Sequence, residues 1–139
     1  NVHTGFTVRQ IADARERHPD VRVIVHPECP RPVVEAADED GSTEYIIRRV
    51  AELPAGSAVA IGTDWNLVDR LRLRHPDKTV FCLREALCPC VTMNRITLPK
   101  LVWAFEALAA GEVPNVVRVD EDMARWARVA LDRMLALPG

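Results

Sequence analysis

The sequence predicts an α/β fold: a three-layer α-β-α domain with a short parallel sheet. Three short runs rich in β-branched and apolar residues, at 21–25, 57–61 and 79–83, have the length and composition of buried strands. Segments with helical periodicity separate these runs, so each strand is expected to reach the next through a helical crossover. Crossovers of this kind connect parallel strands, and a parallel sheet needs helices on both of its faces.

The helices are predicted from their capping residues and from the residues that end them. Thr7 and Gln10 have the spacing of a capping box, and the helix that they open should end at His18, because Pro19 disfavours helix in the residue before it. Leu101, Trp103, Phe105 and Leu108 are expected in the core. Further helices are expected at 30–38, 43–53, 65–74, 98–108 and 120–135, with a loop at 84–96.

Composition excludes several classes of function. The net charge is −2 and basic residues are dispersed among acidic ones, which argues against a nucleic-acid binder or a membrane-surface binder. No apolar run is long enough to span a bilayer, and the first residues lack the features of a signal peptide. The chain lacks an initiator Met, so we expect a trimmed chain or a piece of a longer protein. A 48% hydrophobic composition needs no disulfides, so we expect reduced thiols and a cytoplasmic location.

Polar side chains are expected at the carboxyl ends of the predicted strands, where parallel sheets bind their ligands. His26 and Glu28 follow the first strand, and Gly62-Thr63-Asp64 follows the second. The first two residues are either an acid/base or substrate-binding pair, or ordinary polar residues of a surface loop. Gly41-Ser42-Thr43 opens a helix, where hydroxyls and free amides bind a carboxylate or phosphate, unless they only cap the helix.

The four cysteines occur in two kinds of sequence. Cys82 lies in a strand-like run and Cys29 precedes a proline, and both are expected as small buried side chains. Cys88 and Cys90 lie in the predicted loop. A zinc site would need a second pair, and a redox pair more often has two residues between its cysteines. Spacing alone leaves three interpretations: a metal ligand completed from elsewhere, a thiol-redox pair, or incidental residues of a non-catalytic α/β module.

Five segments, in order along nearly the whole chain, resemble motifs of the quinolinate synthase family. Each would be weak alone, but their order and spacing make the resemblance strong. They are VHTGFT at 2–7 with HPDVRVIVHPE at 18–28, AADEDGSTEYI at 36–46, IGTDWNLVDRLRLRHPDK at 61–78, CVTMNRITLPKLVWAFEAL at 90–108 and ARVALDRML at 127–135.

The resemblance implies an enzyme of NAD biosynthesis, a transferase that condenses iminoaspartate with dihydroxyacetone phosphate to quinolinate. It also implies a 4Fe–4S cluster as Lewis acid, held by three cysteines, one from each of three pseudo-repeated domains. An aspartate oxidase or dehydrogenase would supply the iminoaspartate. On this view 1–20 ends the preceding domain or links to it, 21–115 is the third α/β domain, and 116–139 is a closing strand and helix. The missing N-terminal domains would be partners, and the chain alone would be inactive.

The resemblance also implies roles for individual residues. Glu28 would be the catalytic acid/base and also contact the substrate, and His3 and His26 would contact the substrate or polarise its oxygens, with His26 counted as catalytic. Ser42 and Thr43 would hold a substrate carboxylate or phosphate.

The cluster ligand and one departure from the family follow from the same motifs. Cys90 would be the single iron ligand in this chain, because it stands three residues before Met93, as in C-x-x-M; alignment on A-L-C-P would choose Cys88 instead. Asp64 stands where the family has Glu, and its shorter side chain could weaken whatever contact that residue makes.

Overall fold

The protein is described by a computed structural model that covers residues 2–84 and 90–137. Contacts divide the chain into two units, Asn1–Arg95 and Ile96–Gly139. The predicted divisions at 20/21 and 115/116, which concern a longer protein, stay predictions.

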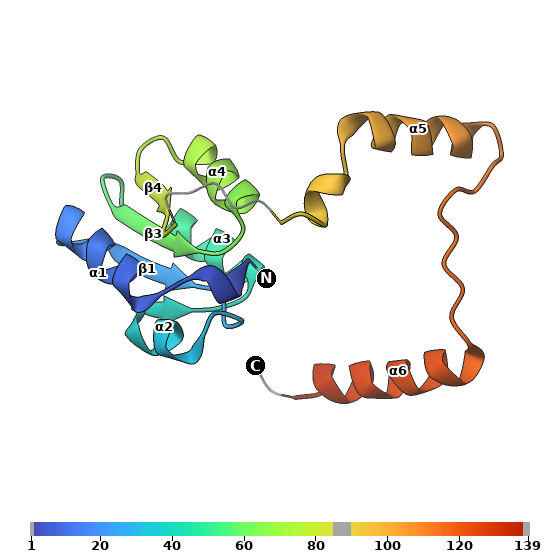
Figure 1. Ribbon diagram of the computed structural model, residues 1–139, viewed down its shortest axis with the longest axis horizontal. Helices are drawn as coiled ribbons and strands as arrows, with labels where there is room; N and C mark the ends of the chain where they lie inside the picture. Colours follow the sequence, from blue (N-terminus) through green and yellow to red (C-terminus); the bar gives the residue numbers. More distant parts are fainter. Residues whose placement is uncertain (1, 85–89, 138–139) are drawn as a thin grey trace. The chain divides into compact units, whose positions relative to one another are not determined.

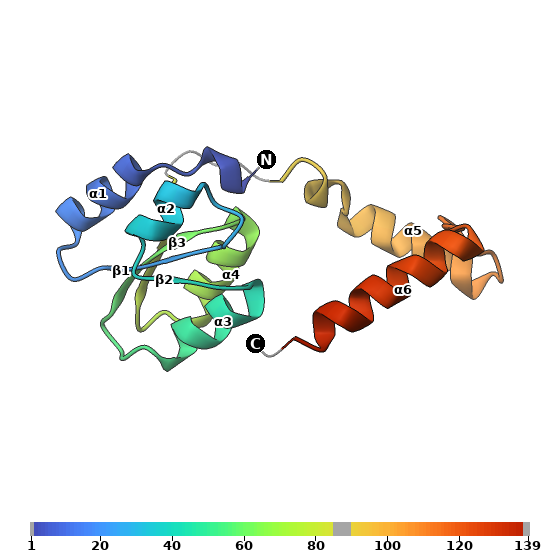
Figure 2. The same cartoon turned by 90° about the horizontal axis from the view of Figure 1, so that it is seen from below.

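The first unit is an α/β domain built on a four-stranded parallel sheet with the strand order β2-β1-β3-β4. Helices α1 and α2 cover one face and α3 and α4 cover the other, which confirms the three-layer arrangement (Figures 1 and 2). Its elements are η1 (His3–Gly5), α1 (Val8–Arg17), β1 (Arg22–Val25), α2 (Arg31–Ala36), β2 (Glu39–Asp40), α3 (Thr43–Glu52), β3 (Ala58–Gly62), α4 (Trp65–Arg74), β4 (Thr79–Cys82) and η2 (Met93–Arg95).

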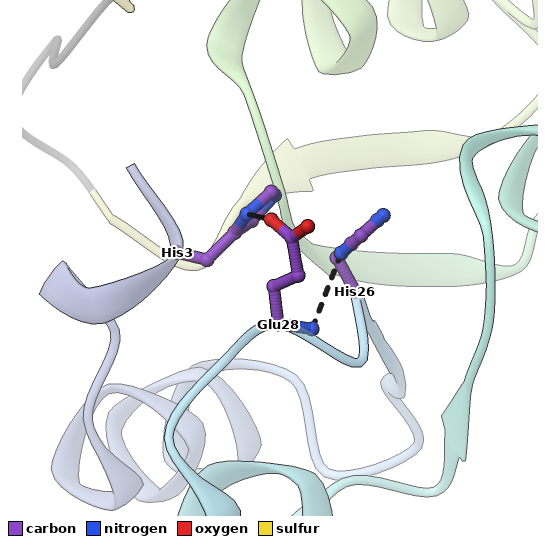
Figure 3. Close-up of side chains that lie close together, drawn as sticks. All are labelled: His3, His26 and Glu28. Atoms are coloured by element: carbon purple, nitrogen blue, oxygen red, sulfur yellow. Dashed lines mark hydrogen bonds and ion pairs between the residues drawn. The ribbon is translucent and has the colours of Figure 1, made fainter. Parts of the chain in front are cut away.

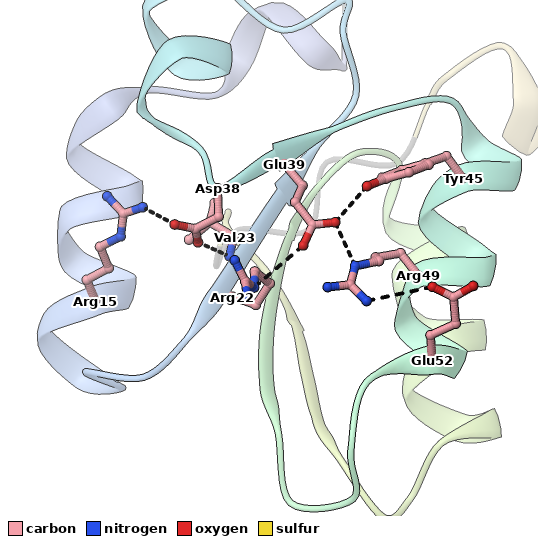
Figure 4. A network of polar contacts seen from close by, with 8 residues as sticks. All are labelled: Arg15, Arg22, Val23, Asp38, Glu39, Tyr45, Arg49 and Glu52. Carbon is pink, nitrogen blue, oxygen red and sulfur yellow. Dashed lines mark hydrogen bonds and ion pairs between the residues drawn. The ribbon is translucent and has the colours of Figure 1, made fainter. Parts of the chain in front are cut away.

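Strand β2 was not predicted, because its two residues are both acidic and carry no hydrophobic alternation. Polar contacts hold it beside β1 (Figure 4). Asp38 accepts a hydrogen bond from the Val23 amide at 2.7 Å, and its own amide donates to the Val23 carbonyl at 3.0 Å. Glu39 accepts hydrogen bonds from the Tyr45 hydroxyl and from Arg49 on α3. The edge strand is therefore fixed by side-chain contacts that a hydrophobic pattern does not reveal.

The core lies where the apolar periodicity places it. The Thr7 hydroxyl and the Gln10 side chain form the predicted capping box of α1, which buries Ile11 and Ala14. Both predicted core cysteines, Cys29 and Cys82, are buried. The central strands β1 and β3 supply fully buried valines and isoleucines, as expected for strands covered on both faces.

The second unit contains α5 (Leu98–Ala109) and α6 (Glu121–Leu135). Thr97 precedes α5 without a side-chain capping bond, whereas Asp120 caps α6. The expectation of core positions on α5 was wrong within the second unit, whose own described residues leave the apolar side chains of this helix exposed. Those side chains, 44–61% exposed, are Leu101, Trp103, Phe105 and Leu108. Among the described residues, no helix combines the length and apolar character needed to span a bilayer.

Candidate functional site

The chain reverses its direction across the sheet between β1 and β3. From β1 it passes through α2 on one face to β2, whereas from β3 it passes through α4 on the other face to β4. Loops leaving neighbouring strands toward opposite faces open a crevice at the carboxyl edge of a parallel sheet. His26 follows β1 and Thr63 follows β3, and the His26 amide donates to the Gly62 carbonyl at 3.1 Å. The topology therefore brings these two segments to one point.

His3, from η1, joins this crevice and connects its two sides (Figure 3). Its Nδ1 lies 2.8 Å from Glu28 Oε2, and its Nε2 lies 3.2 Å from Thr63 Oγ1. Because a carboxylate only accepts, Nδ1 carries the hydrogen, and Nε2 of the neutral ring accepts from the Thr63 hydroxyl. Thr63 is 4% exposed, while the Glu28 side chain is 71% exposed. The carboxylate is thus held from the protein side and open on the other.

His26 is held in a defined tautomer beside His3. The Glu28 amide donates to His26 Nδ1 at 3.2 Å, so the neutral ring carries its hydrogen on Nε2. Burial, together with the neighbouring His3, lowers the pKa of His26, and the charge of Glu28 only partly offsets this. His26 is therefore a neutral hydrogen-bond donor near pH 7.

The ligand atoms of His3, His26 and Glu28 lie within 4.8 Å of one another, close enough to raise the question of a metal site. An ion bound by both imidazoles would lie about 2.1 Å from each nitrogen and in the plane of each ring. The rings are stacked, with centroids 4.3 Å apart and planes 9° apart, and nearly parallel stacked planes share no such point. The arrangement favours hydrogen bonding and proton transfer over chelation.

A cavity of about 510 Å³ adjoins this group in the first unit. Thr43, at the first position of α3, lines it together with His3 and Thr63. Two predicted site residues, His3 and Thr43, therefore share one cavity with Thr63. Ser42 instead uses its hydroxyl oxygen as the N-cap of α3, accepting from the Tyr45 amide at 3.2 Å. Arg70 of α4 also lines the cavity and supplies a positive charge.

Hydrogen bonds around Cys90 shift its thiol toward the thiolate form. Its Sγ lies 3.0 Å from the Thr92 hydroxyl, and this hydrogen bond, with those from the Met93 and Thr92 amides, lowers the pKa of the thiol. Burial acts in the opposite direction on the other two described cysteines: it raises the pKa of Cys29 to about 11 and also raises that of Cys82. Cys88 lies outside the described residues.

Comparison with known proteins decides the family. The family model described as quinolinate synthetase A protein matches residues 1–136. The chain belongs to the quinolinate synthase family. The chain is 54% identical over 137 residues to the quinolinate synthase of Corynebacterium glutamicum, covering 99% of this chain and 35% of that protein. It is 52% identical over 136 residues to the enzyme of Anoxybacillus flavithermus, covering 98% and 37%. The chain thus spans about a third of the length of these relatives.

The donor set fits one corner of the iron–sulfur cluster that the quinolinate synthase family implies. Thiolates are the usual ligands of such clusters, and Cys90 is the described cysteine whose surroundings favour the thiolate. Cys29 donates its S–H to the Gly62 carbonyl at 3.4 Å and is buried, so it acts as a core residue. A single thiolate fits as one ligand among several, and the others would come from sequence beyond this chain.

Two site residues were not singled out from the sequence. Thr63 was noted only as part of a polar cluster, although its place directly after a buried strand was the signal that could have found it. Arg70 lies one helical turn after Asn66, and both line the cavity. The i, i+4 spacing from the start of α4 could have indicated that face.

Proposed function

We propose that this chain is the part of a quinolinate synthase that carries the acid/base group, some of the substrate contacts and one cluster ligand. The complete cytoplasmic enzyme would condense iminoaspartate with dihydroxyacetone phosphate to quinolinate. The observation that carries this proposal is the hydrogen-bonded series Glu28–His3–Thr63, which lies at the carboxyl edge of the sheet in a chain of this family.

Glu28 is the group that moves protons. Forming quinolinate from these substrates requires removal of protons from carbon and loss of water, and a positioned carboxylate serves both steps. His3 donates to Oε2 and so orients the carboxylate, while the largely exposed side chain leaves the carboxylate open to the substrate. The neutral His26 donates from Nε2 to a substrate oxygen, which supports a role in polarisation rather than in proton removal.

Thr43 and Arg70 are suited to bind the anionic groups of the substrates. Thr43 contributes a hydroxyl and the positive N-terminal end of the ten-residue helix α3 to the cavity, and Arg70 contributes a guanidinium. Both substrates are anions, one with carboxylates and the other with a phosphate.

Cys90 would be this chain's ligand to a 4Fe–4S cluster. When bound, the cluster supplies a Lewis-acidic iron site to the reaction. Because one thiolate cannot hold a cluster, we expect the 139-residue chain alone to show no synthase activity.

The test measures iron and sulfide in the full-length polypeptide, purified without oxygen. About four irons per chain are expected in the unmodified protein, lost in Cys90→Ala and retained in Cys88→Ala. Cys29→Ala is the matched control, since its thiol is buried and its pKa is raised. Loss of iron only in Cys88→Ala would support the proposed function but identify Cys88 as the cluster ligand in place of Cys90. Absence of iron in every form after anaerobic reconstitution would refute the proposal.

A further inference from the structure

Asp64 uses its two carboxylate oxygens for two different parts of the chain. Oδ1 accepts from the Asn66 amide at 3.0 Å and caps helix α4. Oδ2 accepts from the Cys90 amide at 3.2 Å, across 26 residues of sequence. The Asp64 side chain therefore connects the start of α4 to the backbone of Cys90.

A second connection holds the other side of the Cys90 backbone. The side-chain amide of Asn66 donates to Asn94 Oδ1 at 3.4 Å. Asn94 in turn donates to the Cys90 carbonyl at 3.2 Å from its side chain and at 2.9 Å from its backbone. We call Asp64, Asn66 and Asn94 the polar clamp. Asp64 accepts from the amide of Cys90, Asn94 donates to its carbonyl, and Asn66 donates to Asn94.

The length of the Asp64 side chain suits this double role. Asp is among the best N-cap residues because an oxygen of its short side chain accepts from the first free amides of the helix. The oxygen that does not cap the helix is then fixed in space and can accept from a second amide. Asp64 thus makes two specific contacts in this structure.

We propose that Asp64 is a positioning residue for Cys90, acting through the polar clamp to fix the backbone that directs the thiolate toward the cluster. The role in cluster binding rests on the proposed function, but the hydrogen bonds that hold the Cys90 backbone do not. Fixing the backbone in advance lowers the entropy lost when a ligand loop binds its metal group.

The test separates the capping of α4 by Asp64 from the hydrogen bond between Asp64 and the Cys90 amide. Asp64→Asn keeps Oδ1 for the cap, because Asn is an equally good N-cap, but presents an N–H to the Cys90 amide in place of Oδ2. Asp120→Asn is the matched control: Asp120 caps α6 and accepts both of its hydrogen bonds through Oδ1. Asn94→Ala opens the clamp from the other side.

The first readout is hydrogen exchange of the Cys90 amide in the cluster-free, full-length polypeptide. Asp64→Asn should speed this exchange about tenfold, the effect of losing one hydrogen bond, and leave the Asn66 amide protected. Asn94→Ala should speed it as well, and Asp120→Asn should not change it. A Cys90 amide that exchanges at the same rate in the unmodified protein and in both clamp variants would overturn the proposal.

The second readout is the rate at which a chelator removes iron from the reconstituted protein. Faster loss in Asp64→Asn than in Asp120→Asn, at equal thermal midpoints, is expected, and equal rates would overturn the role in cluster binding. If neither the unmodified protein nor any variant binds iron, the proposed function fails. The exchange result still decides whether Asp64 holds the Cys90 amide.

Discussion

The imidazole ring of His3 stacks on that of His26, with 4.3 Å between the ring centroids and 9° between their planes (Figure 3). Each ring is held by a different group of the same residue: the Glu28 carboxylate accepts from His3, and the Glu28 amide donates to His26. Two stacked rings cannot both carry a positive charge without repulsion. Burial of His26 and this repulsion from His3 together lower the pKa of His26 and so favour its neutral state.

Stability should depend on pH through His26. Its pKa in the folded protein lies below the ordinary value of 6.5, so the unfolded chain binds a proton first as the pH falls. The contribution of His26 to stability is complete above pH 6.5 and is lost as the pH falls from there toward the folded pKa. Urea unfolding between about pH 8 and pH 5 measures it, and His26→Asn should flatten this part of the profile.

His18 provides the control for this experiment. It lies at the end of α1, away from the stacked pair, so His18→Asn should leave the slope below pH 6.5 in place. An unchanged slope in His26→Asn would contradict the assignment.

Turnover of the full-length enzyme should depend on the Glu28 carboxylate. Glu28→Gln keeps the size and one acceptor oxygen but cannot take up a proton, so kcat should fall by about a hundredfold or more while KM changes little. Glu35→Gln is the control, because Glu35 lies on α2 and forms an exposed ion pair with Arg31. Steady-state kinetics measure both variants. An undiminished kcat in Glu28→Gln would contradict the acid/base role of Glu28.

Gly62 keeps β3 and its neighbours in close contact at the edge that bears the site. A Cβ there would lie 2.8 Å from Val25 Cγ1 and 3.2 Å from Leu83 Cδ1, both in the packed core. Gly62→Ala should lower the free energy of unfolding by about 1–3 kcal/mol through overpacking. At Gly5 the atoms nearest to an added Cβ belong to the end of the flexible Arg84 side chain, so Gly5→Ala should cost less. Denaturant unfolding of both variants compares them, and equal costs would contradict the packing argument.

Residues that act over short distances in the sequence were predictable. The Thr7–Gln10 capping box, the ends of α1 and α4, and the strand-end position of His26 follow from local rules on caps, prolines and parallel strands. The family motifs added His3, whose position beside Glu28 depends on a contact across 25 residues. No local pattern encodes such a contact.

What the sequence did not predict depends on pairing between distant polar groups. Strand β2 forms because Asp38 and Glu39 find partners on β1 and α3. The double contact of Asp64 has the same character, since a carboxylate in a turn gives no sign of which distant amide its second oxygen meets. Apolar periodicity misjudged α5 for a different reason: it measures the tendency of a helix face to be buried, but not whether the second unit itself supplies residues that cover this face.

The network around Glu39 should add stability that acid removes (Figure 4). The Glu39 side chain is 14% exposed, and its carboxylate accepts from the Tyr45 hydroxyl at 2.7 Å and from Arg49 Nε at 2.8 Å, with Arg22 Nε 3.5 Å away. Burial alone would raise the pKa of Glu39, but the hydrogen bonds from Arg49 and Tyr45 and the positive charges together lower it. A carboxyl with a lowered folded pKa stabilises the protein fully above its ordinary value of 4.5, and that stability disappears as the pH falls through the folded pKa.

Glu39→Gln should therefore lower the free energy of unfolding by about 1–2 kcal/mol at pH 7, a charged hydrogen-bond contribution reduced for partial exposure. The difference from the unmodified protein should shrink as the pH falls below about 4. The exposed Glu35→Gln change should cost about 0.5 kcal/mol or less at either pH. A Glu39→Gln difference that stays constant from pH 7 to pH 3 would mean that side-chain packing, and not the carboxylate charge, holds β2 at the edge of the sheet.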